Sequence, residues 1–253
     1  MATLERITKA PALYNDVSPT LTPGHLYGYI DPDLGFQEWI YSKMTDAVSV
    51  AYTLYKKVAD KTNITIDEVG PNPTLELRDS GNFTANLYSG MLATIYTDIG
   101  GAGAAPEGES RRIKTNTTGA LILDRPLSVA VAVNDVAHIL NLGELAVAVA
   151  TGNQLARDQL VGFAARALTA NYWGLFLRKG RGRFLAGAGT VTKGKGLIMD
   201  ATAANQGKLT VSASTSQAEI VLGHCVSIGS GAVQGLGDFD LDAFNGLDIK
   251  GST

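Results

Sequence analysis

Chain-breaking residues and apolar residues alternate along the first part of the sequence. Prolines and glycines recur between Pro11 and Gly35, and they interrupt any long helix or central strand. Apolar and aromatic side chains that need burial lie among them: Leu13, Tyr14, Leu26, Tyr27, Tyr29 and Ile30. The pattern predicts an extended N-terminal arm over residues 1–35, lying across its own domain or a neighbouring subunit. An ordered loop over the protein's own core fits the same pattern.

Residues 36–150 form the second predicted region, which is mixed and rich in strands. Apolar positions at three- and four-residue steps indicate a helix in part of 36–59, although strand competes over Val48–Leu54. Residues 82–99 fit helix or strand equally. Shorter runs predict strands around Ile64–Ile66 and Leu75–Leu77, then at Ala120–Leu123, Leu127–Val133 and Leu145–Ala150, with a turn near 134–141. The valines of 128–133 fall on one face of the predicted strand.

The third predicted region, residues 151–253, opens with a helix over 153–170 and continues with strands. Glycine-containing turns separate the strands, as at Lys179-Gly180 and Asn205-Gln206-Gly207. The predicted strands are 172–177, 183–185, 190–192, 197–200, 208–213, 220–228 and 238–241. Short strands at this spacing are typical of a small β-barrel or sandwich. The predicted fold class is therefore mainly β with a few helices.

Composition adds the expectation of an assembled protein. Charged residues make up 18% of the 253 residues, and hydrophobic residues make up 45%. Interface cores are depleted of charged residues, so a low charge content is compatible with surface buried in assembly. The net charge of −3 is spread unevenly, because residues 151–196 are basic and the flanking regions are acidic. A chain with this pattern can pair head to tail with copies of itself.

Two segments approach known ligand-binding motifs and depart from them. Residues 189–196 match GxxxxGK, but Gly196 stands where a P-loop has Ser or Thr, and a strand-like run follows instead of a helix. We expect a β-turn there. Residues 238–242 read DFDLD, but Ala243 and Ile249 stand where a calcium loop has Gly and Glu. We expect a strand with Phe239 and Leu241 turned inward.

The sequence predicts no catalytic, cofactor-binding or metal-binding residues, and hence no enzyme. His224 and Cys225 are adjacent, and neighbours on a strand point to opposite faces, so they would not act together. The single cysteine excludes an intrachain disulfide. No apolar run of transmembrane length is present, so we expect no membrane partner.

A basic cluster, Arg178, Lys179, Arg181 and Arg183, follows the aromatic residues Tyr172, Trp173 and Phe176. Aromatic and basic residues together are the ingredients of single-strand binding. A solvated hairpin tip fits the cluster better, and pairing with acidic groups of a partner protein is a further possibility. We expect no direct contact with nucleic acid.

The order of segments between 151 and 235 resembles the small β-barrels of capsid cement, or decoration, proteins of tailed bacteriophages. The resemblance rests on the aromatic strand 172–180, the glycine-rich turn and apolar strand 189–200, the strand 207–211 and the late strand 220–231. It implies a virion structural protein, made in the host cytoplasm, that binds the outer capsid surface as a homotrimer. The implied partners are the major capsid protein and further copies of itself.

The expected partner-binding residues come from the arm and the basic cluster: Tyr14, Leu26, Tyr27, Tyr29, Arg178, Lys179, Arg181 and Arg183. Three other functions remain open at this point. One is another virion component, such as a tail or connector protein. Another is a β-rich glycan-binding module using Trp39, Trp173 or Tyr27, and the last is an enzyme with a dispersed site.

Overall fold

The computed structural model describes most of the chain as a β protein. The described residues are 4–45, 50–97, 106–141, 146–150, 159–187, 191–200, 202–211, 221–228 and 234–241. Strands account for 48% and helices for 3%, and the described part contains no helix of seven or more residues. The sheets curl into a half-barrel. The predicted fold class, mainly β and partly barrel-like, is confirmed.

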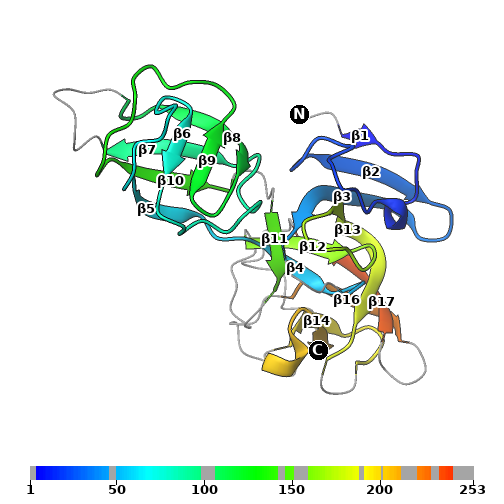
Figure 1. The fold of residues 1–253 in the computed structure, drawn as a ribbon. Coiled ribbons are helices and arrows are strands. Elements are labelled where there is room, and N and C mark those ends of the chain that lie inside the picture. Colours follow the sequence, from blue (N-terminus) through cyan, green and yellow to red (C-terminus); the bar gives the residue numbers. More distant parts are fainter. Residues whose placement is uncertain are drawn as a thin grey trace. The chain divides into compact units, whose positions relative to one another are not determined.

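The chain divides into two compact units, and one is inserted into the other (Figure 1). Unit 1 comprises residues 1–57 and 147–253, and unit 2 comprises residues 58–146. The boundaries predicted from sequence, after residues 35 and 150, differ from this division. The strands flanking the insertion pair with each other, with Lys57 opposite Val147. The chain therefore leaves unit 1 and returns to it at two positions that lie side by side in its sheet.

Unit 1 contains one eleven-stranded sheet in the order β1-β2-β3-β11-β4-β12-β13-β17-β16-β14-β15. An additional pairing of β3 with β13 curls this sheet back on itself. The bounds are β1 Glu5–Arg6, β2 Leu26–Asp31, β3 Gly35–Met44, β4 Leu54–Lys57, β11 Ala146–Val149, β12 Leu160–Ala164, β13 Trp173–Leu185, β14 Gly196–Met199, β15 Leu209–Val211, β16 Gly223–Ile228 and β17 Gln234–Asp240. Two 3-10 turns, η1 Pro11–Leu13 and η3 Ala203–Asn205, belong to the same unit.

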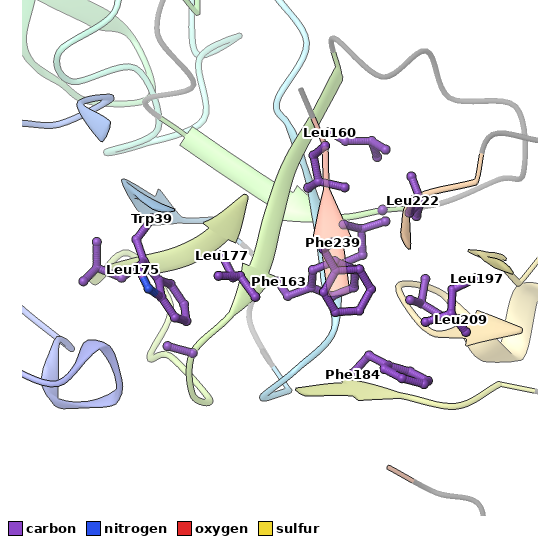
Figure 2. Packing of buried hydrophobic residues seen from close by; sticks show 14 of the residues in the cluster. Trp39, Leu160, Phe163, Leu175, Leu177, Phe184, Leu197, Leu209, Leu222 and Phe239 are labelled. Carbon is purple, nitrogen blue, oxygen red and sulfur yellow. The ribbon is translucent and has the colours of Figure 1, made fainter. Parts of the chain in front are cut away.

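The main core of unit 1 gathers aromatic and aliphatic side chains from strands distant in sequence. The rings of Phe163 and Phe239 lie in the middle of this cluster, with centroids 4.3 Å apart (Figure 2). Leu177 approaches from β13, and Leu197 and Leu209 from β14 and β15. Each fully buried side chain of this size stabilises the fold by roughly 1.5–3 kcal/mol.

Unit 2 contains a six-stranded sheet with a separate core. Its order is β5-β10-β7-β8-β9-β6, with β5 Lys61–Thr65, β6 Glu76–Arg78, β7 Leu92–Thr97, β8 Ser110–Asn116, β9 Ala120–Leu123 and β10 Val136–Leu140. Ile66, Leu77, Ile95, Leu121 and Ile139 are at most 1% exposed and belong to one cluster. None of these residues shares a core cluster with unit 1.

The N-terminal segment is part of unit 1 and packs over its core. Ile7, Tyr14 and Tyr27 are each at most 7% exposed and belong to the main cluster. Short pieces of structure, β1, η1 and β2, anchor the segment between its prolines and glycines. Of the two readings of this segment, packing over the protein's own core is the one seen in the structure.

Two predicted helices were wrong, because the strands in their place are buried on both faces. Residues 35–44 form β3, whose last six residues are all buried, and residues 160–164 form β12, which is buried throughout. A strand covered on both faces loses its alternation and reads as a continuous apolar run. The first part of the second predicted helix, 153–158, lies outside the described residues.

The predicted strand Leu127–Val133 was also wrong. Val131 is 3% exposed, whereas Val129 and Val133 are 46% and 43% exposed, so the three valines do not share one buried face. Isolated backbone bonds to Thr74 and Pro73 hold this stretch in place of a ladder. The strand β10, Val136–Leu140, occupies the position of the predicted turn.

Candidate interaction surface

The hairpin of β2 and β3 has one face in the core of unit 1. Tyr27 and Trp39 are directly opposite each other, and with Tyr41 they are at most 6% exposed. Gln37 is also buried, where its Nε2 donates to the Arg181 carbonyl at 2.6 Å and its Oε1 accepts from Trp39 Nε1 at 3.2 Å. The alternation of a strand turns the intervening side chains to the opposite face.

That opposite face carries four exposed apolar side chains, here called the apolar patch: Leu4, Leu26, Ile30 and Phe36. Leu4 and Leu26 are each 36% exposed, and Ile30 and Phe36 are each 52% exposed. Ile30 and Phe36 are direct cross-strand partners. A Cβ at Gly28 would lie 3.0 Å from Leu4 Cδ2 and 3.2 Å from Phe36 Cε2, so both side chains lie over this glycine. Exposed apolar groups that cluster in this way mark interaction sites, whereas scattered ones do not.

A row of charged side chains, here called the charged row, borders the apolar patch. In register across the sheet, Glu38 of β3 faces Lys179 of β13, and Lys179 faces Asp240 of β17. Lys179 Nζ lies 3.1 Å from Asp240 Oδ2. One step along, Arg181 binds Asp238 through two bonds, 2.9 Å from Nε to Oδ1 and 3.1 Å from Nη2 to Oδ2. The charges of these five residues nearly balance.

The basic cluster predicted as a hairpin tip lies within one continuous strand, so the predicted turn at Lys179-Gly180 was wrong. Gly180 has φ +103°, and a Cβ there would lie 2.5 Å from the Phe36 carbonyl oxygen. The glycine therefore permits close approach of β3 rather than a chain reversal. A bulge in the pairing with β3 between Leu177 and Lys179 brings Lys179 opposite Glu38.

The acidic partners of this cluster come from the same chain. Lys179 and Arg181 pair with the aspartates of β17, and Arg178 Nη1 donates to the Leu160 carbonyl at 3.4 Å. Arg183 lies over the ring of Tyr52, with 5.7 Å from Cζ to the ring centroid. The exposed cations therefore form part of a mixed-charge surface rather than an uncompensated basic patch.

The predicted partner-binding residues of the N-terminal segment divide between the two faces. Tyr14 and Tyr27 are buried, and Tyr29 is half-buried against the main cluster, whereas Leu26 belongs to the apolar patch. The sequence analysis did not identify Leu4, Phe36 or Glu38 as members of a surface. Alternate positions place Leu26, Gly28 and Ile30 on one face of the first strand, and Phe36 and Glu38 on one face of the second. This alternation is the signal that could have found the surface.

A polar network fixes the N-terminal segment beneath this hairpin. Tyr41 Oη donates to Asp16 Oδ2 at 2.6 Å and accepts from the Thr20 amide at 3.1 Å. Burial, together with the bond to Asp16, raises the pKa of Tyr41 to about 12. The neutral hydroxyl is therefore favoured in the folded protein.

The remaining candidate motifs take the local structures predicted for them. Lys193 and Gly194 form a turn, with φ +79° at Gly194, and β14 follows directly. Phe239 and Leu241 are at most 3% exposed while Asp238 is turned outward, which confirms the predicted strand. His224 is exposed and Cys225 is buried, as their adjacent places on β16 require, and burial raises the pKa of the Cys225 thiol. In the part of the chain that the structure describes, no group of three His, Cys, Asp or Glu side chains could hold a metal ion.

The aromatic residues considered for glycan binding lie in the interior. Trp39 and Trp173 are each 6% exposed, and Tyr27 is 2% exposed. Trp173 stacks on Tyr41 with ring centroids 5.8 Å apart. These rings do not offer an open face on which a sugar could stack.

Comparison with known proteins found no matching family model, no curated relative and no similar solved structure. Among the described residues, no helix has the length and apolar character needed to cross a membrane.

Proposed function

We propose that this protein is a virion structural protein that binds the outer capsid surface and cements adjacent major capsid subunits, acting as a homotrimer. The observation that carries the proposal is the apolar patch. It exposes Leu4, Leu26, Ile30 and Phe36 on the outer face of a hairpin whose other face is buried in the core. The neighbouring charged row holds cations and anions side by side, which suits a protein partner better than a polyanion. The resemblance of residues 151–235 to decoration proteins is the reason for proposing the capsid as the partner.

The test is co-sedimentation with capsids that lack this protein. We expect the wild-type chain to bind such capsids in stoichiometric amount, and the double variant Ile30→Ser, Phe36→Ser to lose binding at least ten-fold. Because both side chains are half exposed, the unfolding midpoint should change little. The matched control is Val129→Ser in unit 2, where a side chain of similar exposure is truncated.

Two results would overturn the proposal. One is wild-type protein that stays in the supernatant, and the other is a patch variant that binds capsids as well as the wild type. Light scattering tests the trimer separately. Binding to purified tails in place of capsids would favour the alternative virion role.

A further inference from the structure

A cavity of about 180 Å³ lies within unit 1, beneath the N-terminal segment. Aromatic and aliphatic side chains supply most of its wall: Pro11, Trp39, Tyr52, Phe163 and Leu177. Ala12, Ala164 and Ala165 leave space where larger side chains would close it. Cavities of about 150 Å³ with such walls bind benzene, whereas pockets for drug-sized molecules begin near 300 Å³. The cavity therefore has room for one ring.

The wall residue Tyr52 has an unusual backbone conformation. Its φ is +65°, a region that bulky residues rarely adopt. Two bonds fix the backbone there, since the Tyr52 amide donates to the Ala164 carbonyl at 2.9 Å and the Leu185 amide donates to the Tyr52 carbonyl at 3.1 Å. The Tyr52 ring thus lines the cavity and lies beneath the guanidinium of Arg183.

Arg183 differs from the two cations that precede it on β13. Lys179 and Arg181 each face an aspartate of β17, but the residue opposite Arg183 is Leu236. Among the described residues, no carboxylate lies within ion-pair distance of Arg183, and its side chain is exposed at the cavity. Asp31 also borders the cavity, but its Oδ1 accepts the amides of Asp33 and Leu34 at 2.9 and 3.0 Å.

We propose that this cavity binds a single aromatic side chain of a partner protein, and that Arg183 binds a carboxylate next to that side chain in the partner's sequence. The size and walls of the cavity select the ring, and the guanidinium of Arg183, which has no carboxylate partner among the described residues, selects the anion. The choice of a protein as ligand rests on the proposed assembly function. The site itself can be measured with small molecules.

The probes are N-acetylphenylalanine, which carries the ring and the carboxylate, and N-acetylphenylalaninamide, which carries the ring alone. Saturation-transfer NMR on the full chain should show millimolar binding of the acid and weaker binding of the amide. Ala12→Trp should abolish binding of both, because the exposed Ala12 borders the cavity and the indole fills it. Arg183→Gln should weaken binding of the acid about ten-fold and leave the amide unchanged. The matched control Arg181→Gln should alter neither.

No saturation transfer to either probe would overturn the inference, as would equal binding of the acid by wild-type protein and by Arg183→Gln. Failure of this site is distinguishable from failure of the assembly function. If the probes do not bind but capsids still do, the cavity has no such role and the proposed function stands. If the probes bind but capsids do not, the cavity is a binding site whose partner is not the capsid.

Discussion

The two units differ in how far apart their paired strands lie along the sequence. Unit 2 is one continuous stretch, residues 58–146, in which β8 pairs with β9 immediately after it. In unit 1, β3 pairs with β13, which joins residues 35–44 to residues 173–185. Long-range pairing must overcome the entropy of closing a large loop before its contacts stabilise the fold.

This difference makes unit 2 the simpler folding problem. Its strands and its core lie within 89 residues, so we expect it to fold without the rest of the chain. Unit 1 can complete its sheet only when chain on both sides of the insertion comes together. A folded unit 2 would hold the ends of β4 and β11 close together. The entropy cost of bringing these two strands together would then be smaller.

The largest expected effect comes from the core of unit 1. Phe163→Ala removes a ring that packs on Phe239, and we expect a loss of about 3–5 kcal/mol in the free energy of unfolding. Calorimetry should show the unit 1 transition lowered while the unit 2 transition stays in place. Leu121→Ala is the reciprocal variant and should lower unit 2 alone. A common shift of both transitions by either variant would refute independent cores.

A pH effect should also be confined to unit 1. The pKa of Tyr41 is raised to about 12, so between pH 10 and 12 the unfolded chain loses a proton that the folded chain keeps. Stability present below pH 10 should therefore fall as the pH rises, by at most about 3 kcal/mol for this group. Denaturation of the wild type and of Tyr41→Phe across this range should differ in slope. Parallel curves for the two proteins would contradict the raised pKa of Tyr41.

Excising unit 2 should change unit 1 less than either of the preceding perturbations. Replacing residues 58–146 with a short glycine turn joins Lys57 to Val147, which already face each other. We expect the shortened chain to keep a cooperative transition with a midpoint near the original. Residues 58–146 alone should unfold cooperatively too, as circular dichroism can measure. An unfolded isolated unit 2 would show that its core is insufficient.

The smallest expected effect is that of a surface ion pair. Arg181→Gln breaks the bond to Asp238, but both side chains are about half exposed, so solvent screens the pair. The unfolding midpoint should stay within experimental error at any salt concentration. A clear, salt-dependent drop would mean that the charged row stabilises unit 1.

Sequence reasoning succeeded where a strand has one wet face and failed where both faces are buried. The outward Asp238 and inward Phe239 followed from alternation alone, and so did the opposite placement of His224 and Cys225. In β3 and β12 burial removed that alternation, so the apolar runs were assigned to helices. The apolar patch went unnoticed for a different reason, because the segment that begins at Phe36 was assigned in part to a helix and its alternation was not used.

The basic cluster shows a second limit of sequence reasoning. Arg181 and Asp238 lie 57 positions apart, and no local pattern connects them. The cavity likewise gathers η1, Tyr52, β12 and β13, whose sequence positions give no hint of proximity.

The sequence by itself determined a β-rich chain and the inward and outward sides of strands with one wet face, because alternation is a local property. The tertiary structure decided which apolar segments became buried strands and which residues formed unit 2. It also decided that Arg183 lies opposite Leu236, whereas Lys179 and Arg181 lie opposite aspartates. These outcomes depend on pairing energies between distant segments, which a single sequence does not display.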